Sequence, residues 1–457
     1  MFIAVIGCGY LGAVHAACMA EFGHQVVGVD LDETKVKDLS AGRAPFFEPE
    51  LPGLLERAMA SGRLRFDHDI SVLTRREVSE GSPDGTGGPM VAFVCVGTPQ
   101  RKGEFAADTS YVDGAVAALL PYLRPGDLVV GKSTVPVGTA DRLADVVTAA
   151  VPGAMLAWNP EFLREGHAVA DTQRPDRLVY GLPPDTPEAP DRAAAARALL
   201  DAVYADPIAA GVPLIIADYA TSELVKTAAN AFLATKISFI NAMAEVCEAA
   251  GADVAVLAAA IGHDERIGPK FLGAGLGFGG GCLPKDIRAF MARAGELGAD
   301  QALTFLREVD AINMRRRIRM VELAREVLGG SFLGKKVAVL GAAFKPDSDD
   351  IRDSPALNVA AQIKLQGADV VVTDPAAIEN ARRIWPELQF SPSIDETCGR
   401  ADAVLLLTEW KIYRDIDPVA LGTLVRGRNV LDGRNALDPT QWRAAGWNYR
   451  ALGRPRA

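Results

Sequence analysis

Short apolar runs alternate with helix-like segments along the N-terminal half of the chain. In Leu11 to Phe22 the apolar residues repeat with a spacing near 3.6, the period of an α-helix. The apolar runs between such segments are short and rich in β-branched residues, which is typical of strands. These runs are Phe2 to Ile6, Gln25 to Val29, Met90 to Val96, Asp127 to Val130, Ala154 to Trp158 and Leu178 to Tyr180. The alternation predicts a parallel, doubly wound sheet.

A long segment in the middle of the chain predicts a single helix. Tyr219 to Ala250 contains no Pro or Gly, repeats its apolar residues on one face, and is followed by Gly251, a typical helix stop. At ~1.5 Å per residue, this helix would be roughly 48 Å long. A helix of that length is typical of a connection between domains or of a subunit interface.

A second β/α series begins near Lys335, after a glycine-rich loop from Gly262 to Gly281. Its strand-like runs are Val337 to Leu340, Val370 to Thr373, Ala403 to Leu407 and Asn429 to Leu431. The expected fold class is α/β, with two Rossmann-like doubly wound parallel-sheet domains joined by the long central helix and a helical middle domain. We expect domain boundaries at 1–213, 214–325 and 326–457, and a surface loop at Gly81 to Pro89, which has no periodicity.

Composition narrows the classes of function. The 457 residues are 49% hydrophobic, which is enough for two or three cores, and 48 Lys and Arg against 58 Asp and Glu give a net charge of −10. This charge argues against a nucleic-acid or membrane-surface binder. The apolar stretch Ala228 to Ala244 contains Asn230, Lys236 and Asn241, so it predicts a buried helix and not a membrane span.

The start of the chain and its cysteines suggest a cytoplasmic protein. Met1 leads directly into an apolar run with no basic region before it, which does not fit a signal peptide. The cysteines at 8, 18, 95, 247, 282 and 398 form no CxxC pair, so no disulfide is expected. The five histidines lack metal-ligand spacing, and there is no HExxH, GxSxG or Walker motif, so no metal is expected.

A dinucleotide fingerprint opens the chain. Gly7, Gly9 and Gly12 form a GxGxxG between a predicted strand and a predicted helix, the context in which this motif is informative. Asp30 ends the next strand, where a carboxylate would hold the ribose hydroxyls of NAD and repel the 2′-phosphate of NADP. Val96 to Pro99 and Lys132 to Pro136 follow later strands at the sheet edge where ligands bind in such folds.

Cys282 is the candidate nucleophile. It follows a run of glycines and precedes Leu283-Pro284-Lys285-Asp286, where Pro284 suits the first turn of a helix. A thiol at a helix N-terminus beside a lysine can have a pKa lowered from ~8.5 toward ~3.5 to 7.5. The other cysteines lie in apolar patterns or carry no signal, so we expect them to be inert.

Three polar pairs are spaced four residues apart, which on a helix puts both members on one face. They are Glu161 with Glu165, Lys226 with Asn230, and Cys282 with Asp286. Lys226 stands out because it lies in an otherwise apolar helix, where a lysine needs a partner or a task. Lys345 follows the first strand of the second series, where Gly341 would open a turn facing a phosphate. Arg266, Arg352 and Arg434, each taken alone, are expected to be surface charges.

In these motifs the chain resembles the UDP-glucose/GDP-mannose dehydrogenase family of nucleotide-sugar 6-dehydrogenases, over essentially its whole length. The motifs that carry the resemblance are Gly7 to Gly12, Val96 to Pro99, Lys132 to Val137, Asn159 to Leu163, Lys226 with Asn230, Gly277 to Asp286, Phe344-Lys345 and Asp432 to Arg434.

The resemblance implies a four-electron oxidation of the sugar C6 alcohol of UDP-glucose to a carboxylate, with NAD as the cofactor and a homodimer as the assembly. Cys282 would form a thiohemiacetal and then a thioester, which water hydrolyses. Lys226 and Asn230 would stabilise oxyanion character, Asp286 would position or activate water, and Glu161 would serve acid/base work, with Thr134 also at the catalytic site. Such groups suit this chemistry on general grounds.

Further site residues follow from the same resemblance. Besides Gly7, Gly9, Gly12 and Asp30, the cofactor would be bound or bordered by Leu11, Lys35, Thr98, Thr134, Glu165, Lys285 and Arg352. The nucleotide-sugar would be held by Glu161, Phe162, Leu163, Glu165, Lys226, Asn230, Phe271, Gly275, Gly279 and Lys345, with Arg266 reaching across a dimer interface and Arg434 near the uridine.

The chain departs from the family pattern at two positions. Gly281 stands where the family commonly has Ser, which predicts a looser loop, and His167 stands where Thr or Ser is usual. Three alternatives stay open: the same mechanism on GDP-mannose or UDP-N-acetylmannosamine, a two-electron dehydrogenase of the phosphogluconate type, and a non-catalytic nucleotide-sugar binding protein. The Leu283 to Asp286 segment argues against the N-acetylmannosamine type, and the glycine-framed Cys282 argues against the phosphogluconate type. The presence of Cys282, Lys226 and Asp286 together argues against a non-catalytic binding protein.

Overall fold

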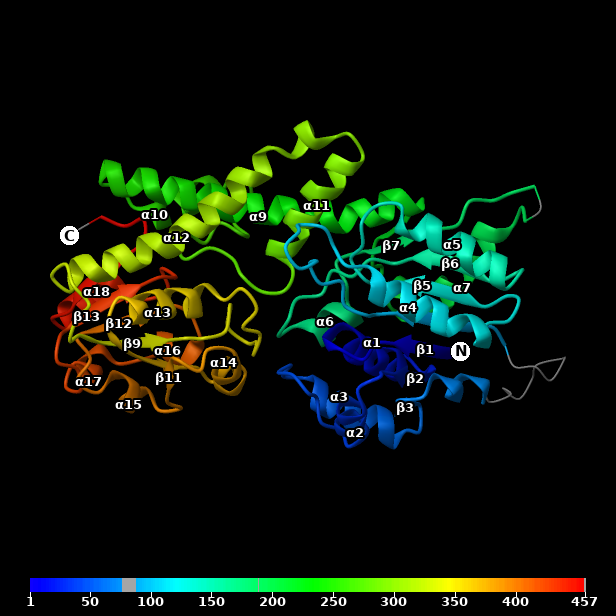
Figure 1. The fold of residues 1–457 in the computed structure, drawn as a ribbon, viewed down its shortest axis with the longest axis horizontal. Helices are drawn as coiled ribbons and strands as arrows, with labels where there is room; N and C mark the ends of the chain where they lie inside the picture. The colour runs from blue at the N-terminus through cyan, green and yellow to red at the C-terminus, as the bar shows by residue number, and fades with distance from the viewer. Residues whose placement is uncertain (76–87, 188, 456–457) are drawn as a thin grey trace. The chain divides into compact units, whose positions relative to one another are not determined.

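The computed structural model describes residues 1–75, 88–187 and 189–455. The chain divides into two compact units, Met1–Ala229 and Asn230–Ala457, and each has its own sheet with helices packed on it (Figure 1). The boundary lies within the long helix α9 (Tyr219–Ala250). The division into three domains after residues 213 and 325 stays a prediction.

Among the described residues, the first unit holds an eight-stranded sheet in the order β3-β2-β1-β4-β5-β6-β7-β8. Its neighbouring strands are parallel except β6 and β7, which meet in antiparallel fashion at Trp158 and Gly181. The predicted parallel sheet therefore has one antiparallel junction. The strands are β1 (Phe2–Ile6), β2 (Gln25–Val29), β3 (Leu64–Asp67), β4 (Met90–Val94), β5 (Leu128–Gly131), β6 (Met155–Trp158), β7 (Leu178–Gly181) and β8 (Leu214–Ala217).

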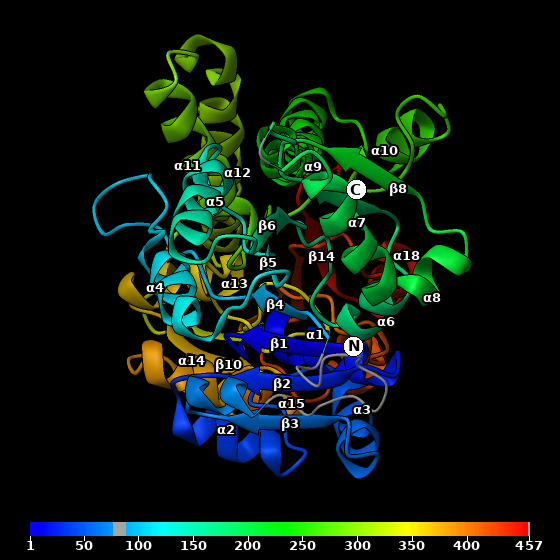
Figure 2. The same ribbon diagram turned by 90° about the vertical axis from the view of Figure 1, so that its right-hand side faces the viewer.

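Side chains of the first sheet alternate between two apolar cores, because successive residues of a strand point to opposite faces. Ile3 and Val5 belong to one core, whereas Ala4 and Ile6 belong to the other. Figure 2 shows α4 and α5 on one side of the stacked strands and α6 and α7 on the other. The helices of this unit are α1 (Tyr10–Glu21), α2 (Glu33–Ser40), α3 (Leu51–Ala60), η1 (Ile70–Thr74), α4 (Ser110–Leu119), η2 (Leu120–Tyr122), α5 (Thr139–Ala150), α6 (Ala168–Gln173), α7 (Arg192–Val203) and α8 (Ala205–Ala209).

The long helix has the bounds that the sequence predicts, Tyr219–Ala250, and Gly251 ends it with φ +75°. The following helices are α10 (Val254–Gly262), α11 (Leu283–Glu296), η3 (Asp300–Leu303) and α12 (Phe305–Val327). Gly262 closes α10, so the glycine-rich loop begins one residue later than predicted. Within the second unit, residues of α9, α11 and α12 share a small apolar core that includes Ala234, Ile287 and Val309.

The second unit holds a six-stranded sheet in the order β11-β10-β9-β12-β13-β14, and its described strands pair in parallel. Figure 1 shows α13 on one face of this sheet and α15 and α17 on the other. The strands are β9 (Lys336–Leu340), β10 (Asp369–Thr373), β11 (Gln389–Phe390), β12 (Ala403–Leu406), β13 (Asn429–Asp432) and β14 (Asn448–Ala451). The helices are α13 (Pro355–Leu365), α14 (Ile378–Ile384), α15 (Ile394–Cys398), α16 (Lys411–Arg414), α17 (Pro418–Leu421) and α18 (Pro439–Ala444).

The expected fold class is thus confirmed, with additional strands that the apolar pattern did not reveal. β3, β8, β11 and β14 are short and lie at the edges of the two sheets. β3, β11 and β14 carry polar side chains, whereas β8 is an apolar run that sequence reasoning overlooked, with Ile215 and Ile216 each 44% exposed. Of the predicted surface loop, residues 81–87 lie outside the described residues.

Candidate active site

The first glycine-rich turn joins β1 to α1. Gly7 has φ +88°, a left-handed backbone that glycine adopts without strain. A Cβ atom on Gly12 would overlap the carbonyl oxygen of Gly7, so α1 can begin this close to β1 only with glycine there. At Gly9, by contrast, no atom lies within 4 Å of where a Cβ would stand. The backbone at this turn is open to a close-fitting pyrophosphate, and Leu11 lies half-buried beside it.

Asp30 follows β2 directly and is fixed to the glycine turn. Its Oδ2 accepts hydrogen bonds from the backbone N–H of Cys8 and from the Lys35 ammonium, each at 2.8 Å. A carboxylate held next to an open glycine turn fits the adenosine ribose of NAD and repels a 2′-phosphate. The observed turn therefore fits NAD, and Lys35 orients the Asp30 carboxylate, whereas a place for Asp30 beside the ribose stays a prediction.

Two threonines, one after β4 and one after β5, are joined by a hydrogen bond. Thr98 is buried and donates its hydroxyl to the carbonyl oxygen of Thr134 at 2.7 Å, whereas the Thr134 side chain is half-buried. Ser133 donates its hydroxyl to the carbonyl of Val96 at 2.6 Å. The two predicted ligand-binding turns thus form one continuous edge of the first sheet.

Glu161 lies in an irregular segment after β6, held from both sides of its carboxylate. Oε1 accepts the backbone N–H groups of Phe162 at 2.6 Å and Leu163 at 2.7 Å. Oε2 pairs with the ammonium of Lys132 at 3.2 Å. Sequence reasoning gave Lys132 no role, although a lysine directly after a buried apolar strand was a usable signal.

The predicted helical pairing of Glu161 with Glu165 is wrong. Residues 159 to 164 have no regular structure, and Glu165 lies in a turn, since Pro160 removes a backbone donor and Gly166 has φ +81°. The turn is anchored instead by Glu48, which sequence reasoning missed. The buried Glu48 carboxylate accepts the backbone N–H of Gly166 at 2.8 Å and the Tyr10 hydroxyl.

Lys226 is half-buried on α9, in the first unit, and lies near an aromatic ring. Its Nζ is 5.5 Å from the centroid of the Phe162 ring, which also has the Arg177 guanidinium at 3.9 Å. Attraction between a cation and an aromatic ring fixes the position of such a side chain without neutralising its charge. Phe162 therefore orients the candidate catalytic ammonium, and Arg177 is a neighbour that the sequence did not indicate.

In the second unit, Cys282 caps the N-terminus of α11. Its side chain is exposed, Pro284 stands in the first turn as predicted, and the backbone N–H of Asp286 donates to the Cys282 carbonyl at 2.9 Å. The helix macrodipole places partial positive charge at this end of α11. This position favours a thiolate and a nucleophilic role.

Asp286 lies one turn further along α11 and is 2% exposed. Its Oδ2 accepts a hydrogen bond from the amide of Asn230 at 2.6 Å, and its Oδ1 pairs with the Lys285 ammonium at 2.6 Å. Asn230 lies one turn after Lys226 along α9, so this helix carries both groups that the pattern paired. Asn230, Asp286 and Lys285 thus form one polar cluster beside the thiol.

The glycines before Cys282 are required by close packing inside the second unit. A Cβ on Gly277 would overlap the Asn313 side-chain oxygen, and one on Gly279 would overlap the carbonyl of Asp353. A Cβ on Gly281 would overlap the guanidinium of Arg352. Because those atoms are the far end of an exposed side chain that can move, the expectation that Gly281 makes the loop looser stays a prediction. Arg352 itself is 63% exposed and pairs with Asp350 at 2.7 Å.

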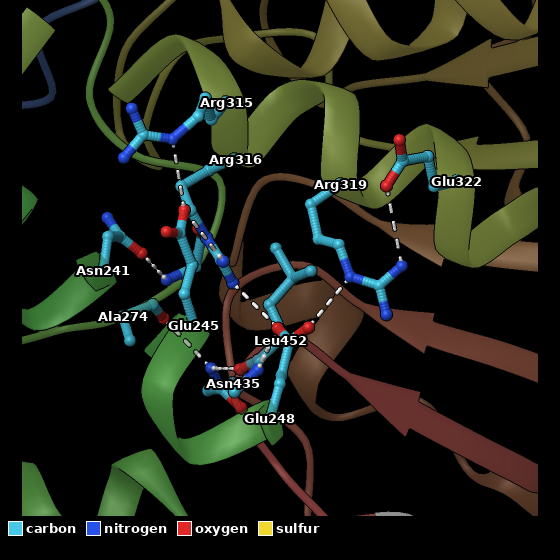
Figure 3. A network of polar contacts seen from close by, with 12 residues as sticks. Asn241, Glu245, Glu248, Ala274, Arg315, Arg316, Arg319, Glu322, Asn435 and Leu452 are labelled. Carbon is cyan, nitrogen blue, oxygen red and sulfur yellow. Dashed lines mark hydrogen bonds and ion pairs between the residues drawn. The ribbon is translucent and has the colours of Figure 1, made fainter. Parts of the chain in front are cut away.

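Gly275 is held by a buried polar network. Its N–H donates to Asn241 at 2.9 Å, and its carbonyl accepts from Arg316 at 3.5 Å. Arg316 is fully buried and pairs with Glu248 at 3.1 Å, and Glu248 also binds Arg319 at 2.8 Å. Figure 3 shows Arg316 and Arg319 both reaching Glu248.

Arg434 is not the surface charge that its sequence context alone suggested. Its Nε donates to the carbonyl of Leu407 at 2.8 Å, and its terminal nitrogens donate to the carbonyls of Gly277 at 2.9 Å and Phe344 at 3.1 Å. Burial lowers its pKa, while the nearby Glu409, at 3.3 Å, favours the charged form. Arg434 thus fastens the cysteine loop to the second sheet, and a role near the uridine stays a prediction.

Three further residues predicted to bind the substrate, Phe271, Arg266 and Lys345, differ in exposure and in contacts. Phe271 is 40% exposed with φ +65°, and Arg266 is exposed and pairs with Asp264 at 2.6 Å. Lys345 is half-buried, with its Nζ 5.7 Å from the Phe344 ring centroid.

The predicted phosphate-facing turn after Gly341 is closed by the protein itself. The backbone N–H groups of Ala342 and Ala343 both donate to Oδ2 of Asp374, at 2.8 and 3.0 Å. Those two amides are therefore occupied, and a phosphate would have to be bound by other groups. Asp374, which follows β10, accepts hydrogen bonds from the turn after β9, just as Asp30, which follows β2, accepts one from the turn after β1.

Residues 1–75, 88–187 and 189–455 contain neither a candidate membrane-spanning helix nor a candidate metal site. No helix there combines the length and apolar character needed to cross a membrane. No three or more His, Cys, Asp or Glu side chains there are grouped as a metal site would need.

The chain matches known protein families in both of its units. Three models of the UDP-glucose/GDP-mannose dehydrogenase family match the chain: the NAD binding domain at residues 1–205, the central domain at 220–315 and the UDP binding domain at 338–439. The match of the NAD binding domain to the first unit confirms the prediction of NAD as the cofactor.

Individual relatives agree with the family models. The chain is 40% identical to the UDP-glucose 6-dehydrogenase of Rhizobium meliloti, covering 100% of both proteins. It is 38% identical to a UDP-glucose 6-dehydrogenase of Bacillus subtilis, covering 99% of this chain and 93% of the relative. The solved UDP-glucose dehydrogenase of Pyrobaculum islandicum has a TM-score of 0.85 at 35% identity, over 99% of this chain and 98% of that one. The chain belongs to the UDP-glucose/GDP-mannose dehydrogenase family.

Proposed function

We propose that this protein oxidises UDP-glucose at C6 to UDP-glucuronate, using two molecules of NAD in turn and Cys282 as a covalent nucleophile. The observation that carries the proposal is the exposed Cys282 thiol at the N-terminus of α11, one turn before the buried Asp286. The identity of 36–40% to several UDP-glucose 6-dehydrogenases over essentially the full chain supports UDP-glucose as the substrate.

The first glycine turn and Asp30 would hold NAD, which would supply the hydride acceptor for both oxidations at C6. In the first, the C6 alcohol loses a hydride and a proton and becomes an aldehyde. The Cys282 sulfur then adds to the aldehyde carbon, and the oxygen takes a proton, which gives a thiohemiacetal. Loss of a second hydride and of the hydroxyl proton gives a thioester. Water adds to the thioester carbon, the C–S bond breaks, and the carboxylate leaves as the thiol is restored.

Each charged group has a step that suits it. The Lys226 ammonium and the Asn230 amide would stabilise negative charge on the C6 oxygen during addition to the aldehyde and the thioester. Asp286 would accept a proton or orient water, because its carboxylate is already held by Asn230 and Lys285. Glu161 would remove a proton from the attacking water. Overall, one alcohol, two NAD⁺ and one water give one carboxylate, two NADH and three protons.

The stoichiometry of the reaction tests the proposal. The purified protein is incubated with NAD and, separately, with UDP-glucose, GDP-mannose, UDP-N-acetylmannosamine and 6-phosphogluconate, and NADH is measured per sugar consumed. Two NADH per UDP-glucose is the expected result. Two per molecule of either other nucleotide-sugar would overturn the proposed substrate and leave the mechanism. One NADH per 6-phosphogluconate, or none with any sugar, would overturn the proposal.

We further propose a homodimer that uses one face of α9. Phe232, Phe239 and Val246 recur every seven residues, or about two helical turns, and their exposed fractions are 67%, 50% and 57%. An exposed apolar stripe of this kind marks an interaction surface. The wild-type protein should therefore have the mass of a dimer by light scattering, and Phe239→Glu should shift it toward the monomer. A monomeric wild-type protein would refute the proposal.

A further inference from the structure

We propose that Lys132 is a positioning residue that holds the Glu161 carboxylate for hydrolysis of the thioester. This inference rests on the proposed function and assigns a task to a buried cation that the mechanism above does not use. Lys132 would not touch the substrate, and it would act only through Glu161. All the residues that carry the argument lie in the first unit.

Lys132 is placed with little freedom. It is the residue directly after β5, its backbone N–H donates to the carbonyl of Val94 at 3.0 Å, and the residue is 5% exposed. Its ammonium has three donors, and three acceptors lie within reach: Asn159 Oδ1 at 3.0 Å, Glu161 Oε2 at 3.2 Å and the Tyr204 hydroxyl at 3.3 Å. Burying a charge without partners is costly, so these three acceptors offset the cost of burying the Lys132 ammonium and fix its position.

The two neutral acceptors are themselves fixed. Asn159 donates its amide to the carbonyl of Val179 at 2.9 Å, and Tyr204 donates its hydroxyl to Asn159 Oδ1 at 2.6 Å. The nearby His15 ring lies against Phe93 at a centroid distance of 4.4 Å, and burial together with the Lys132 charge lowers the pKa of this histidine. Neutral groups therefore surround the ammonium except at Glu161.

Lys132 remains charged in this setting. Burial lowers its pKa, but the neighbouring Tyr204 and Glu161 raise it by more, so the net shift is upward. The charge of Lys132 is thus available to Glu161 throughout the neutral pH range. This distinguishes the pair from a hydrogen bond between neutral groups, since a charge-assisted contact is stronger and more directional.

Glu161 depends on Lys132 for one of its two oxygens. The backbone N–H groups of Phe162 and Leu163 hold Oε1, whereas Lys132 holds Oε2, and the glutamate side chain is 17% exposed. Without the ammonium, the carboxylate would keep its Oε1 anchors and lose the contact that fixes its plane. Glu161 accepts a proton from water only after both hydrides have left the sugar. The inference therefore assigns Lys132 to the last step of the reaction.

Rapid-mixing kinetics of Lys132→Met test this assignment. The two oxidations precede hydrolysis, so a defect in hydrolysis alone leaves a fast phase of two NADH per active site and slows the turnover that follows. We expect the ratio of the fast rate to the steady-state rate to rise at least about tenfold over wild type, which is within the range of general-base effects. The kcat/KM for UDP-glucose should stay within about twofold of wild type, because hydrolysis follows the oxidations and lowers kcat and KM together. Mass spectrometry of the quenched enzyme should find the sugar nucleotide attached to Cys282.

Two further variants separate this role from a structural one. Glu161→Gln should show the same kinetic pattern, and adding Lys132→Met to it should change the steady-state rate by less than about twofold, because residues that act through one another are not additive. Lys336→Met removes a lysine that binds carbonyls of the second unit, Gly399 at 2.7 Å and Glu396 at 3.3 Å, and should behave as wild type. Where Lys132→Met does not fold, Lys132→Gln keeps a donor and removes the charge.

The possible failures are distinguishable. A wild-type enzyme that does not form two NADH per UDP-glucose overturns the proposed function, whatever the variants do. If the wild-type enzyme does form two NADH per UDP-glucose, the inference about Lys132 alone is overturned by any of three results. These are a slower first hydride transfer in Lys132→Met, an unchanged kinetic pattern in Lys132→Met, or a double variant whose defect is the product of the two single defects.

Discussion

Replacing Gly277 with alanine should destabilise the second unit and impair catalysis. In the loop before Cys282, Gly277 has a left-handed backbone conformation and leaves no room for a Cβ atom. Gly277 has φ +84°, and a left-handed backbone costs a residue with a Cβ about 1–2 kcal/mol. The new Cβ would also overlap Asn313 Oδ1, which accepts the N–H of Phe278 at 2.8 Å, while the Asn313 amide donates to the Phe278 carbonyl at 3.0 Å.

The sum of these effects gives the expected magnitude. Overpacking of a buried site costs about 1–3 kcal/mol. Loss of the two Asn313 hydrogen bonds adds about 0.5–1.5 kcal/mol each. With the backbone strain included, Gly277→Ala should lower the free energy of unfolding of the second unit by roughly 3–8 kcal/mol, a large effect for a single substitution.

Urea unfolding followed by tryptophan fluorescence measures this change. Four of the five tryptophans, at 385, 410, 442 and 447, lie in the second unit, so the signal reports mainly on it. Gly273→Ala is the matched control, since no atom lies within 4 Å of where its Cβ would stand, and it should unfold within about 0.5 kcal/mol of wild type. A Gly277→Ala protein as stable as the control would refute the packing argument.

Other consequences of the structure can be measured in the same way. Burial raises the pKa of Glu223 to about 7, although the N–H groups of Gly138 and Ala140 favour its charged form. Because the folded pKa lies above the ordinary value, the contribution of Glu223 to stability is fully present below about pH 4.5 and falls by up to about 3 kcal/mol as the pH rises to about 7. Glu223→Gln should remove this contribution to the slope of unfolding free energy against pH, and an unchanged slope would contradict the raised pKa. Asp30→Asn should raise the KM for NAD by about tenfold and reduce the preference for NAD over NADP in initial-rate assays, and an unchanged preference would contradict the ribose role. Arg434→Met should lower the unfolding free energy of the second unit by at least about 3 kcal/mol, because three carbonyls lose a charged donor, and a loss below about 1 kcal/mol in urea unfolding would contradict its anchoring role.

The sequence predicted those parts of the fold whose cause is local. The turn at Gly7, Gly9 and Gly12, the bounds of α9 and the start of α11 after Cys282 each depend on neighbouring residues: glycines at a turn, an uninterrupted apolar face, or a proline in the first helical turn. Asp30 could be placed for the same reason, since it ends a strand whose register the apolar run fixes.

Features that depend on residues far apart in the sequence escaped prediction. The edge strands β3 and β14 carry polar side chains, so their apolar pattern is weak, and the reversed pairing of β6 with β7 depends on a single contact at Trp158. Arg434, taken alone, looked like an ordinary charge, and Lys132 stood in a predicted ligand-binding turn with no role of its own, because the acceptors of both side chains come from other strands and loops. Glu161 and Glu165 had helical spacing, but Pro160 and the turn at Gly166 prevented a helix.

Product formation by wild type and Cys282→Ala, measured side by side, tests the central claim most directly. Each protein is incubated with UDP-glucose and excess NAD, and both NADH and UDP-glucuronate are quantified. We expect two NADH and one UDP-glucuronate per UDP-glucose from wild type, and no UDP-glucuronate from Cys282→Ala. A Cys282→Ala protein that still formed UDP-glucuronate with two NADH per sugar would contradict covalent catalysis by Cys282.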